Sequence, residues 1–285
     1  MRSLFITYEL LSAATATLAA TSTTPRLDAE LLLAHVLAWP RAHLLAERNH
    51  QPSAAQQAQF AAAVARRADL EPIAYIVGTK EFYGLTLEVT PATLVPRPET
   101  ELLVALALEQ AHQTQPTAER LRIGDIGTGT GAIALALAHH LPHALVYACD
   151  ICSEALAVAE RNVARHGLAE RIQLRQGDLF AALSERVDML VSNPPYTILA
   201  EVEANVYRHE PHLALDGGTD GAVCYRRMIP LLHQYLRPGG VALFEIGAWQ
   251  GPMLAQLVQT HYPQAQVRIE RDLAGHERVA VVMGL

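Results

Sequence analysis

The sequence predicts an α/β fold in which a doubly wound parallel sheet follows a small helical bundle. Three observations carry this prediction. From residue 121 onward, short apolar runs rich in β-branched residues alternate with helical stretches of Ala and Leu. A glycine-rich turn follows the first of these runs, at the strand end where such sheets bind their ligands. Residues 1–80, by contrast, consist largely of Ala, Leu and Gln, which favour helices.

Length and composition indicate two globular domains. A chain of 285 residues is longer than one typical domain, and 51% hydrophobic residues suffice for a buried core. Three cysteines are too few for a disulfide scaffold, so a reducing cytoplasm fits best. No run of about 18 apolar residues is present, which excludes a spanning helix. The apolar N-terminal stretch contains Glu9 and many threonines, so we expect an amphipathic helix there rather than an export signal.

The formal net charge of −7 is unevenly distributed. Residues 1–80 hold seven Lys or Arg and six Asp or Glu, a balance of +1, which leaves −8 for the remainder. A negative charge on the larger part disfavours direct binding of nucleic acid. Residues 1–80 are therefore the part better suited to an acidic partner.

The first 95 residues are predicted to form a helical bundle followed by a β-hairpin. In RLDAELLLAHVL, residues 26–37, apolar residues recur every three or four positions and give one face that needs packing partners. Several prolines punctuate the stretch, which favours four or five short helices. EFYGLTLEVT, residues 81–90, is aromatic and β-branched around a glycine and predicts a hairpin. We therefore divide the chain into a helical substrate-recognition domain (1–80), a hairpin linker (81–95) and a catalytic domain (96–285).

The catalytic domain is predicted to open with a helix that runs to about His112. Five parallel strands should follow, separated by helical stretches such as residues 153–167, and two later apolar segments should close the sheet as an antiparallel pair. The five strands are expected at 121–127, 144–150, 171–178, 187–193 and 240–247, and the closing pair at 265–272 and 277–284.

The first chemical signal is the turn DIGTGTGA, residues 125–132, between a strand and an Ala/Leu helix. Glycines let the backbone turn sharply and approach a ligand closely. The spacing also fits the G-x-G-x-x-A fingerprint of nicotinamide-binding proteins, so the loop alone leaves the cofactor open. We assign the cofactor loop to Gly127, Thr128, Gly129, Thr130 and Gly131.

Three acidic residues at consecutive strand ends narrow the choice of cofactor. Asp125 precedes the glycines and could accept hydrogen bonds from an ammonium group, which methionine-derived cofactors have and nicotinamide lacks. Asp150 would hold a ribose hydroxyl, and Asp178 would lie at the adenine end. Asp150 and Asp178 could each be a helix N-cap instead, but the spacing of all three favours a binding site.

The deciding motif is Asn193-Pro194-Pro195-Tyr196, directly after the apolar strand VDMLVS. The prolines cannot donate to a sheet and disfavour helix before them, so the chain leaves the strand extended. The amide of Asn193 and the carbonyl of Pro194 can both accept from one planar NH2 group, while Tyr196 offers a ring face for stacking. This arrangement suits methylation of a planar nitrogen. No strong base is required before the attack, because the proton on nitrogen becomes acidic only as the new bond forms. The rate of transfer then depends mainly on how the nitrogen is oriented. We assign all four residues to the catalytic site and Asn193 also to the cofactor site.

Other patterns point to no further chemistry. Cys149 and Cys152 have redox spacing but flank Asp150, and the spacing of His209 and His212 does not suit a zinc helix. The G-x-S-x-G motif of serine hydrolases is absent. We expect no metal site.

With these motifs the chain resembles the peptide chain release factor glutamine methyltransferases over nearly its full length. N-P-P-Y is shared with DNA adenine and ribosomal RNA guanine methyltransferases, whereas the helical module followed by PRPETE is more specific. The resemblance rests on RLDAELLLAHVL, EPIAYIVGTKEFYG, LVPRPETE, DIGTGTGAIALALA, VSNPPY, HEPHLALDGGTDG, LRPGGVALFEIG and DLAGHERV.

The resemblance implies a cytoplasmic enzyme with a Rossmann-like fold that uses S-adenosyl-L-methionine and forms S-adenosyl-L-homocysteine. Its substrate would be the side-chain amide of the glutamine in the Gly-Gly-Gln loop of release factors. The helical domain would bind the release factor away from this loop. It also places Leu179 beside Asp178 at the adenine, although some relatives have an aromatic residue there, and His209 stands where tyrosine is usual. We expect a monomer in isolation that binds no membrane.

Three alternatives remain at this point. The same four residues, Asn193 to Tyr196 (the tetrad), could methylate adenine or guanine in nucleic acid. Such a substrate would need a basic channel, which the charge of −8 on the residues after 80 does not favour. The chain could be a noncatalytic adaptor, but an intact Asn-Pro-Pro-Tyr argues against that reading. A nicotinamide dehydrogenase would need a catalytic His/Lys or Tyr/Lys pair, and no such pair is evident.

Overall fold

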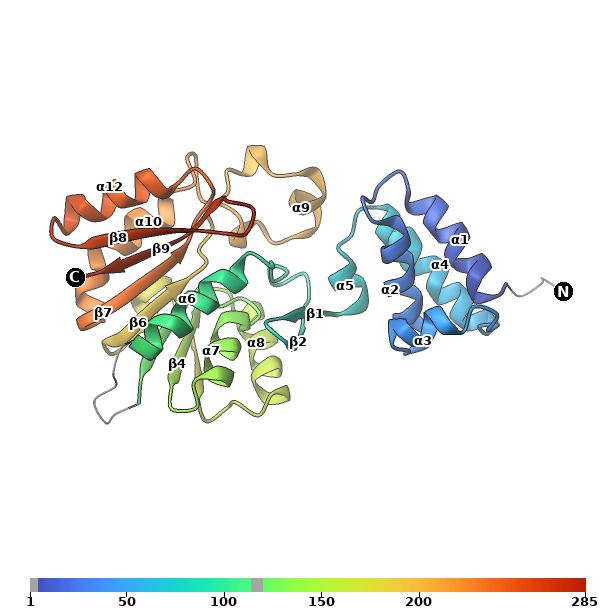
Figure 1. The fold of residues 1–285 in the computed structure, drawn as a ribbon, viewed down its shortest axis with the longest axis horizontal. Helices are drawn as coiled ribbons and strands as arrows, with labels where there is room; N and C mark the ends of the chain where they lie inside the picture. The colour runs from blue at the N-terminus through green and yellow to red at the C-terminus, as the bar shows by residue number, and fades with distance from the viewer. Residues whose placement is uncertain (1–4, 114–119) are drawn as a thin grey trace. The chain divides into compact units, whose positions relative to one another are not determined.

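The computed structural model describes residues 5–113 and 120–285. It divides into two compact units, Met1–Thr79 and Lys80–Leu285, which are described separately (Figure 1). Among the described residues, no helix has the length and apolarity needed to cross a membrane.

The first unit is a bundle of five helices: α1 (Thr7–Leu18), α2 (Pro25–Leu37), α3 (Arg41–Ala46), α4 (Ala54–Ala68) and α5 (Ile73–Val77). The apolar face of α2 supplies Leu32 and Leu33, which are fully buried against Leu11, Leu44 and Phe60. Burial of one leucine side chain stabilises the folded protein by about 2 kcal/mol. The apolar spacing in the sequence thus marks the face of α2 that packs inward.

The second unit begins with the predicted hairpin, in which β1 (Thr79–Phe82) pairs with β2 (Leu85–Glu88). Both turn residues, Tyr83 and Gly84, have positive φ, at 49° and 76°, which is the backbone that two-residue hairpin turns require. Phe82 and Leu87 are buried in the core of the second unit. The hairpin is therefore anchored to the rest of the second unit by its apolar face.

A seven-stranded sheet with the order β5-β4-β3-β6-β7-β9-β8 forms the centre of the second unit. Strands β3 to β7 are parallel, and β9 pairs antiparallel with both β7 and β8. This confirms the predicted doubly wound sheet with its closing antiparallel pair. The strands are β3 (Arg122–Ile126), β4 (Leu145–Asp150), β5 (Ile172–Gln176), β6 (Val187–Ser192), β7 (Leu236–Glu245), β8 (Gln266–Arg271) and β9 (Glu277–Met283).

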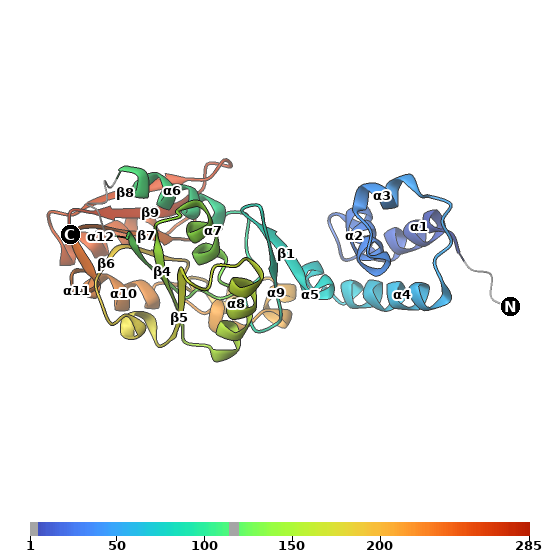
Figure 2. The same ribbon diagram turned by 90° about the horizontal axis from the view of Figure 1, so that it is seen from below.

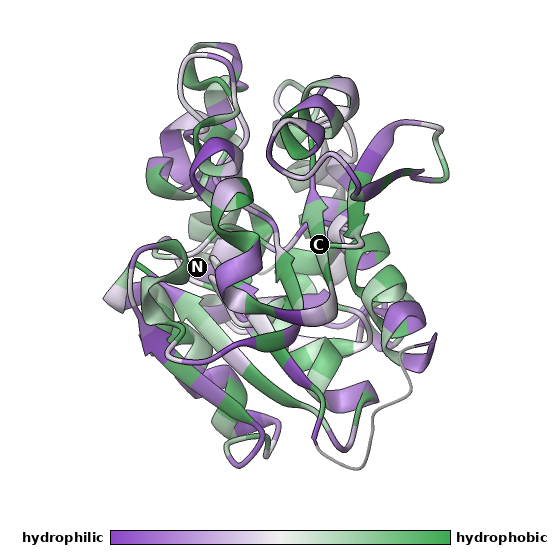
Figure 3. Ribbon diagram, turned by 90° about the vertical axis from the view of Figure 1, so that its left-hand side faces the viewer, coloured by the Kyte–Doolittle hydropathy of each residue, from purple (hydrophilic) through white to green (hydrophobic). Residues whose placement is uncertain are grey.

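Helices cover both faces of this sheet (Figures 1 and 2). One apolar core lies under α6 (Thr100–Gln113), α7 (Ala132–His140) and α8 (Ser153–Arg165). A second core lies under α10 (Val223–Met228), α11 (Leu232–Tyr235) and α12 (Gly251–His261). Figure 3 shows hydrophobic residues, in green, along the strands between these layers.

The segment between β6 and α10 contains α9 (Ala204–His209) and two short 3-10 helices, at Leu199–Glu201 and His212–Ala214. Further 3-10 turns lie at Leu179–Ala182, after β5, and at Ile229–Leu231, after α10. Both β5 and β6 end at the ligand-binding edge of the sheet. The connection that follows β5 and the one that follows β6 therefore begin at the same edge as the glycine loop.

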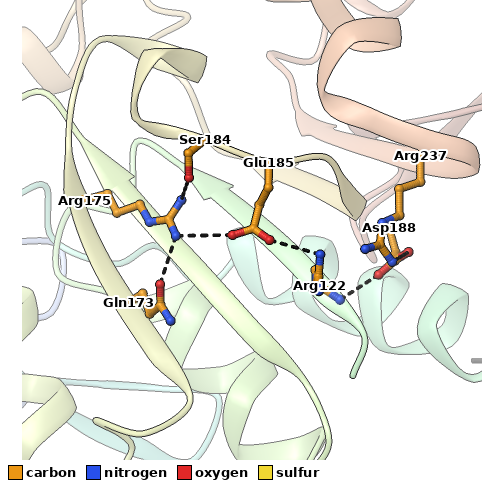
Figure 4. A network of polar contacts seen from close by, with 7 residues as sticks. All are labelled: Arg122, Gln173, Arg175, Ser184, Glu185, Asp188 and Arg237. Atoms are coloured by element: carbon orange, nitrogen blue, oxygen red, sulfur yellow. Dashed lines mark hydrogen bonds and ion pairs between the residues drawn. The ribbon is translucent and has the colours of Figure 1, made fainter. Parts of the chain in front are cut away.

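An ion-pair network lies at the amino ends of the central strands, at the end of the sheet opposite the glycine loop (Figure 4). Glu185 pairs with Arg122 at 3.0 Å and with Arg175 at 3.5 Å, and Asp188 pairs with Arg237 at 3.2 Å. The backbone N–H of Arg122 also donates to Asp188 over 2.8 Å. Since Arg122, Asp188 and Arg237 begin β3, β6 and β7, the network joins neighbouring strands at their amino ends.

Candidate active site

The glycine loop connects β3 to α7 with a backbone that favours glycine. Gly127, Gly129 and Gly131 have φ of 77°, 56° and 82°, a region costly for other residues. The N–H groups of Gly127 and Thr128 donate to the carbonyl of Cys149 over 2.8 and 2.9 Å. These bonds fix the loop to the end of β4.

Asp125 stabilises the loop from inside the protein. It is fully buried, and its Oδ2 accepts hydrogen bonds from the Thr128 hydroxyl at 2.6 Å and the Ala134 N–H at 3.2 Å. Its Oδ1 is buried and has no hydrogen-bond partner among the described residues. Burial raises the pKa of the Asp125 carboxyl to about 7. Asp125 is not among the residues that line the adjacent cavity, so in this structure it contacts the loop and not the space that a ligand would occupy.

A cavity of about 350 Å³ lies along the carboxyl ends of β3, β4, β5 and β6. It combines backbone from the glycine loop with one carboxylate on each of the next two strand ends and with apolar side chains. Such a combination suits an elongated nucleoside ligand. Among the sequence-predicted residues it is lined by Gly127, Thr128, Gly129, Thr130, Asp150, Asp178, Leu179, Asn193 and Pro195, but not by Gly131, which is the N-cap of α7.

The two carboxylates of this cavity differ in environment. Asp150 accepts hydrogen bonds from the N–H groups of Gly129 and Cys152, at 2.8 and 2.9 Å, while burial raises its pKa. Asp178 is half-exposed and pairs with Arg227 at 2.5 Å. Leu179 follows with a positive φ of 50°, an unusual backbone for leucine. Asp150 is therefore rigidly held, whereas Asp178 lies at the open rim.

The Asn-Pro-Pro-Tyr segment follows β6 directly and is neither helix nor strand. The Nδ2 group of Asn193 donates to the Thr100 hydroxyl over 3.1 Å, which leaves its Oδ1 available as an acceptor. The Tyr196 hydroxyl donates to Oε1 of Glu245 over 3.2 Å. Both side chains are thus fixed by residues from other elements, α6 and β7.

Two glycines of the D-G-G-T-D-G segment pack against the backbone of Tyr196. A Cβ on Gly217 would lie 2.7 Å from the Cα of Tyr196, and one on Gly221 would lie 2.3 Å from its carbonyl oxygen. Gly221 also has a φ of 71°. Only glycine permits this close approach, which holds Tyr196 in place from behind.

A second cavity of about 260 Å³ lies on the other side of the tetrad. Asn193, Pro194, Tyr196 and Glu245 contribute to its wall, and Asn193, Leu94, Arg97 and Ala214 line both cavities. Asn193 therefore stands where the two spaces meet. A group held in the second cavity would therefore lie next to a ligand held in the first, with Asn193 among the side chains between them.

A buried ion pair joins the two segments that cover the site. Arg97, in the P-R-P-E-T-E segment, pairs with Glu210 at 2.5 Å, and Glu210 also accepts from the Val95 N–H at 3.2 Å. The Glu210 side chain is only 1% exposed, whereas that of Arg97 is 35% exposed. His209 and His212 flank Glu210 and Pro211 in the sequence. The described residues contain no cluster of side chains that could hold a metal ion.

Sequence reasoning had not assigned roles to Thr100, Glu245, Arg97, Glu210 or Arg227. Four of them lie in segments quoted for the resemblance: Thr100 and Arg97 in LVPRPETE, Glu210 in HEPHLALDGGTDG and Glu245 in LRPGGVALFEIG. The segments were recognised, but contacts between residues so far apart in the chain cannot be read from spacing.

Comparison with known families decides the relationship. Residues 9–78 match the family described as PrmC N-terminal domain, and residues 101–210 match the family described as Methyltransferase small domain. A release factor glutamine methyltransferase from Moorella thermoacetica is 43% identical over 258 residues, 89% of each chain. One from Coxiella burnetii is 42% identical over 91% of this chain and 92% of its own.

The chain belongs to the release factor glutamine methyltransferase family. The resemblance seen in the sequence is thereby confirmed, and so is the class of enzyme. Solved structures agree on the fold of this family member: a methyltransferase from Pyrococcus furiosus gives a TM-score of 0.51 at 20% identity, over 77% of this chain and 95% of its own. The N-terminal domain of human METTL16 in complex with SAH gives 0.52 at 18% identity, over 84% and 86%. At these identities the likeness shows the methyltransferase fold and nothing more specific.

Proposed function

We propose that this enzyme transfers the methyl group of S-adenosyl-L-methionine to the side-chain amide nitrogen of the glutamine in the Gly-Gly-Gln loop of peptide chain release factors. The observation that carries the proposal is the position of Asn193 between two cavities with its Oδ1 left free as an acceptor. The names of the relatives support the substrate.

The first cavity fits S-adenosyl-L-methionine by its chemistry. Gly127, Gly129 and Thr130 offer a close backbone approach for the amino-acid part, and the carboxylate of Asp150 retains free lone pairs for the ribose hydroxyls. Asp178 and Leu179 would border the adenine. The buried Oδ1 of Asp125 lacks a hydrogen-bond partner among the described residues, so this carboxyl can still bind the ammonium end through the loop or a bridging water. When bound, the sulfonium supplies an electrophilic methyl group.

The second cavity would receive the glutamine side chain. The Oδ1 of Asn193 and the carbonyl of Pro194 would accept the two amide hydrogens and turn the nitrogen toward the first cavity. Pro195 keeps this stretch extended because it cannot join a helix or donate to a strand. The ring of Tyr196, held through its hydroxyl, would stack on the planar amide. Orientation of this kind can lower a reaction barrier by several kcal/mol.

We also propose that the first unit binds the release factor at a surface away from its glutamine loop. The charge balance of residues 1–80, which is +1 against −8 for the remainder, supports this role. The acidic side chains around the second cavity, Glu201, Glu203 and Glu245, count against a nucleic-acid substrate, because they would repel phosphates.

The test is methyl transfer from labelled cofactor to three candidate acceptors: release factor, ribosomal RNA and duplex DNA. We expect label on one glutamine of the release factor, located by peptide mass mapping. With Asn193→Ala, transfer should fall about 100-fold while cofactor affinity changes far less, since the lost contact acts on orientation. Label confined to nucleic acid, or full activity of Asn193→Ala, would overturn the proposal.

A further inference from the structure

Methylation of an amide nitrogen releases one proton, which another group must accept. The nitrogen begins with two hydrogens and ends with one, so one proton must leave as the new N–C bond forms. The groups proposed to hold the amide, the Asn193 side chain and the Pro194 carbonyl, are neutral amides and are too weakly basic to keep that proton. A basic group must therefore stand at or near the second cavity.

Glu245 is the carboxylate that the structure places there. It ends β7, is 1% exposed, and lines the second cavity together with Asn193, Pro194 and Tyr196. Its Oε1 accepts the Tyr196 hydroxyl, whereas its Oε2 is buried and has no hydrogen-bond partner among the described residues. A buried carboxylate oxygen without a partner is costly, and a catalytic role is one reason why a protein keeps such a group.

The surroundings of Glu245 tune its charge. Burial raises the pKa of the carboxyl, while the Thr100 and Tyr196 hydroxyls and then Arg278 lower it and Glu99 raises it again. Arg278 is shared with Asp272, at 3.2 Å. The Tyr225 hydroxyl donates to the backbone carbonyl of Glu245 over 2.7 Å.

Two further carboxylates, Glu201 and Glu203, line the same cavity but are exposed. The net result for Glu245 is a pKa of about 7. A group with that pKa can be ionised before the reaction and protonated after it near neutral pH.

We propose that Glu245 accepts the proton that the glutamine amide nitrogen loses during methyl transfer. This rests on the proposed function. An N–C bond forms and the methyl–sulfur bond breaks, with its electron pair left on sulfur. An N–H bond then breaks, its pair returns to the amide nitrogen, and an O–H bond forms at Oε2. The products are the N-methyl amide, the neutral thioether and the Glu245 carboxylic acid, which releases its proton to solvent.

The test is the single-turnover rate of release factor methylation as a function of pH. For the wild type the rate should rise with pH through about 7 and then level off, because only the ionised carboxylate can accept. Glu245→Gln should be about 100-fold slower at pH 8 and should lose this rise. Glu160→Gln, an exposed acid on α8, is the matched control and should keep the wild-type profile.

Tyr196→Phe provides an independent readout. It keeps the ring but removes the hydroxyl that lowers the pKa of Glu245, so the rise in rate should move to higher pH. Cofactor binding by calorimetry shows that each variant is folded. A Glu245→Gln enzyme that binds cofactor and retains the wild-type pH profile would overturn the inference, as would an unshifted profile in Tyr196→Phe. A wild type that never methylates the glutamine would refute the proposed function instead.

Discussion

The amide of Asn193 is held by the hydroxyl of Thr100, 93 residues earlier in the chain, through a hydrogen bond of 3.1 Å. An unrestrained amide could rotate by half a turn and present NH2 where an acceptor is needed. The Thr100 hydroxyl hydrogen-bonds to the Glu245 carboxylate, so toward Asn193 it acts as an acceptor, which favours the orientation with the NH2 group facing Thr100. The first residue of α6 therefore controls the chemistry of a loop that follows β6.

Removing this restraint should affect catalysis more than binding. We expect Thr100→Val to lower kcat by about tenfold, because the isosteric side chain cannot accept from Nδ2 of Asn193. The affinity for cofactor, measured by calorimetry, should change much less. Thr100→Ser keeps the hydroxyl and should recover most of the loss. Equal rates for the Val and Ser variants would show that the hydrogen bond has no catalytic effect.

The close packing behind Tyr196 predicts a strong effect at Gly221. Gly221→Ala would bring a Cβ to 2.3 Å from the Tyr196 carbonyl oxygen at a positive φ, so the tetrad must move. We expect a loss of about 3 kcal/mol in unfolding free energy together with most of the activity.

Gly239 offers a matched control for that substitution. It also has a positive φ, of 78°, but a Cβ there would meet nothing within 4 Å. Gly239→Ala should cost only about 1 kcal/mol and leave methylation intact. Urea denaturation and single-turnover assays of both variants measure the difference. Similar activity losses in the two would refute a specific role for the contact with Tyr196.

The two carboxylates of the cofactor cavity should contribute unequally. Asp150→Ala removes a buried acceptor that also binds the N–H of Gly129, so the Kd for S-adenosyl-L-methionine should rise by about tenfold or more. Asp178→Ala removes a half-exposed carboxylate already paired with Arg227, and a smaller rise is expected. Titration calorimetry at one pH compares them directly. The reverse order would mean that the rim is the dominant contact.

The raised pKa of Asp125 predicts how stability depends on pH. The folded pKa of about 7 lies above the ordinary aspartate value of 3.8, so the folded state binds the proton more tightly. Stability from this group is therefore fully present at low pH and is lost as pH rises toward 7, by on the order of 3 kcal/mol. Asp125→Asn cannot titrate and should lack this share of the decline, while the share from Glu245, whose pKa burial also raises to about 7, should remain. The check is urea denaturation of both proteins from pH 5 to 8, and parallel curves would contradict the assignment.

Much of the fold could be predicted because its signals are local. The apolar spacing of α2, the alternation of strands and helices, and the chemistry of the turn at Gly84 each act within about a dozen residues. The start of β7 at Leu236, four residues before the predicted strand, reflects pairing of Leu236 with Val187 across a register shift. Pairing of that kind depends on a partner strand and leaves no mark on the strand's own sequence.

The position of the Asn-Pro-Pro-Tyr segment beside a cavity could be predicted because it directly follows a strand of the sheet, while its catalytic role stays a prediction. Asp125 is a less local case: its carboxylate accepts from the Thr128 hydroxyl and is not among the groups that line the cavity, so its contact with the cofactor stays a prediction. The links from Thr100 to Asn193 and from Tyr196 to Glu245 span 93 and 49 residues. Only the folded chain brings such pairs together.

The ion-pair network around Glu185 and Asp188 has a practical consequence. It grips the strands at their amino ends, while the reaction belongs to their carboxyl ends. Gly239 is an exposed position in the first half of β7, two residues after Arg237 of this network, and has room for an added side chain. A fluorescent dye or surface tether attached there would report on the enzyme at work without standing in the path of either substrate.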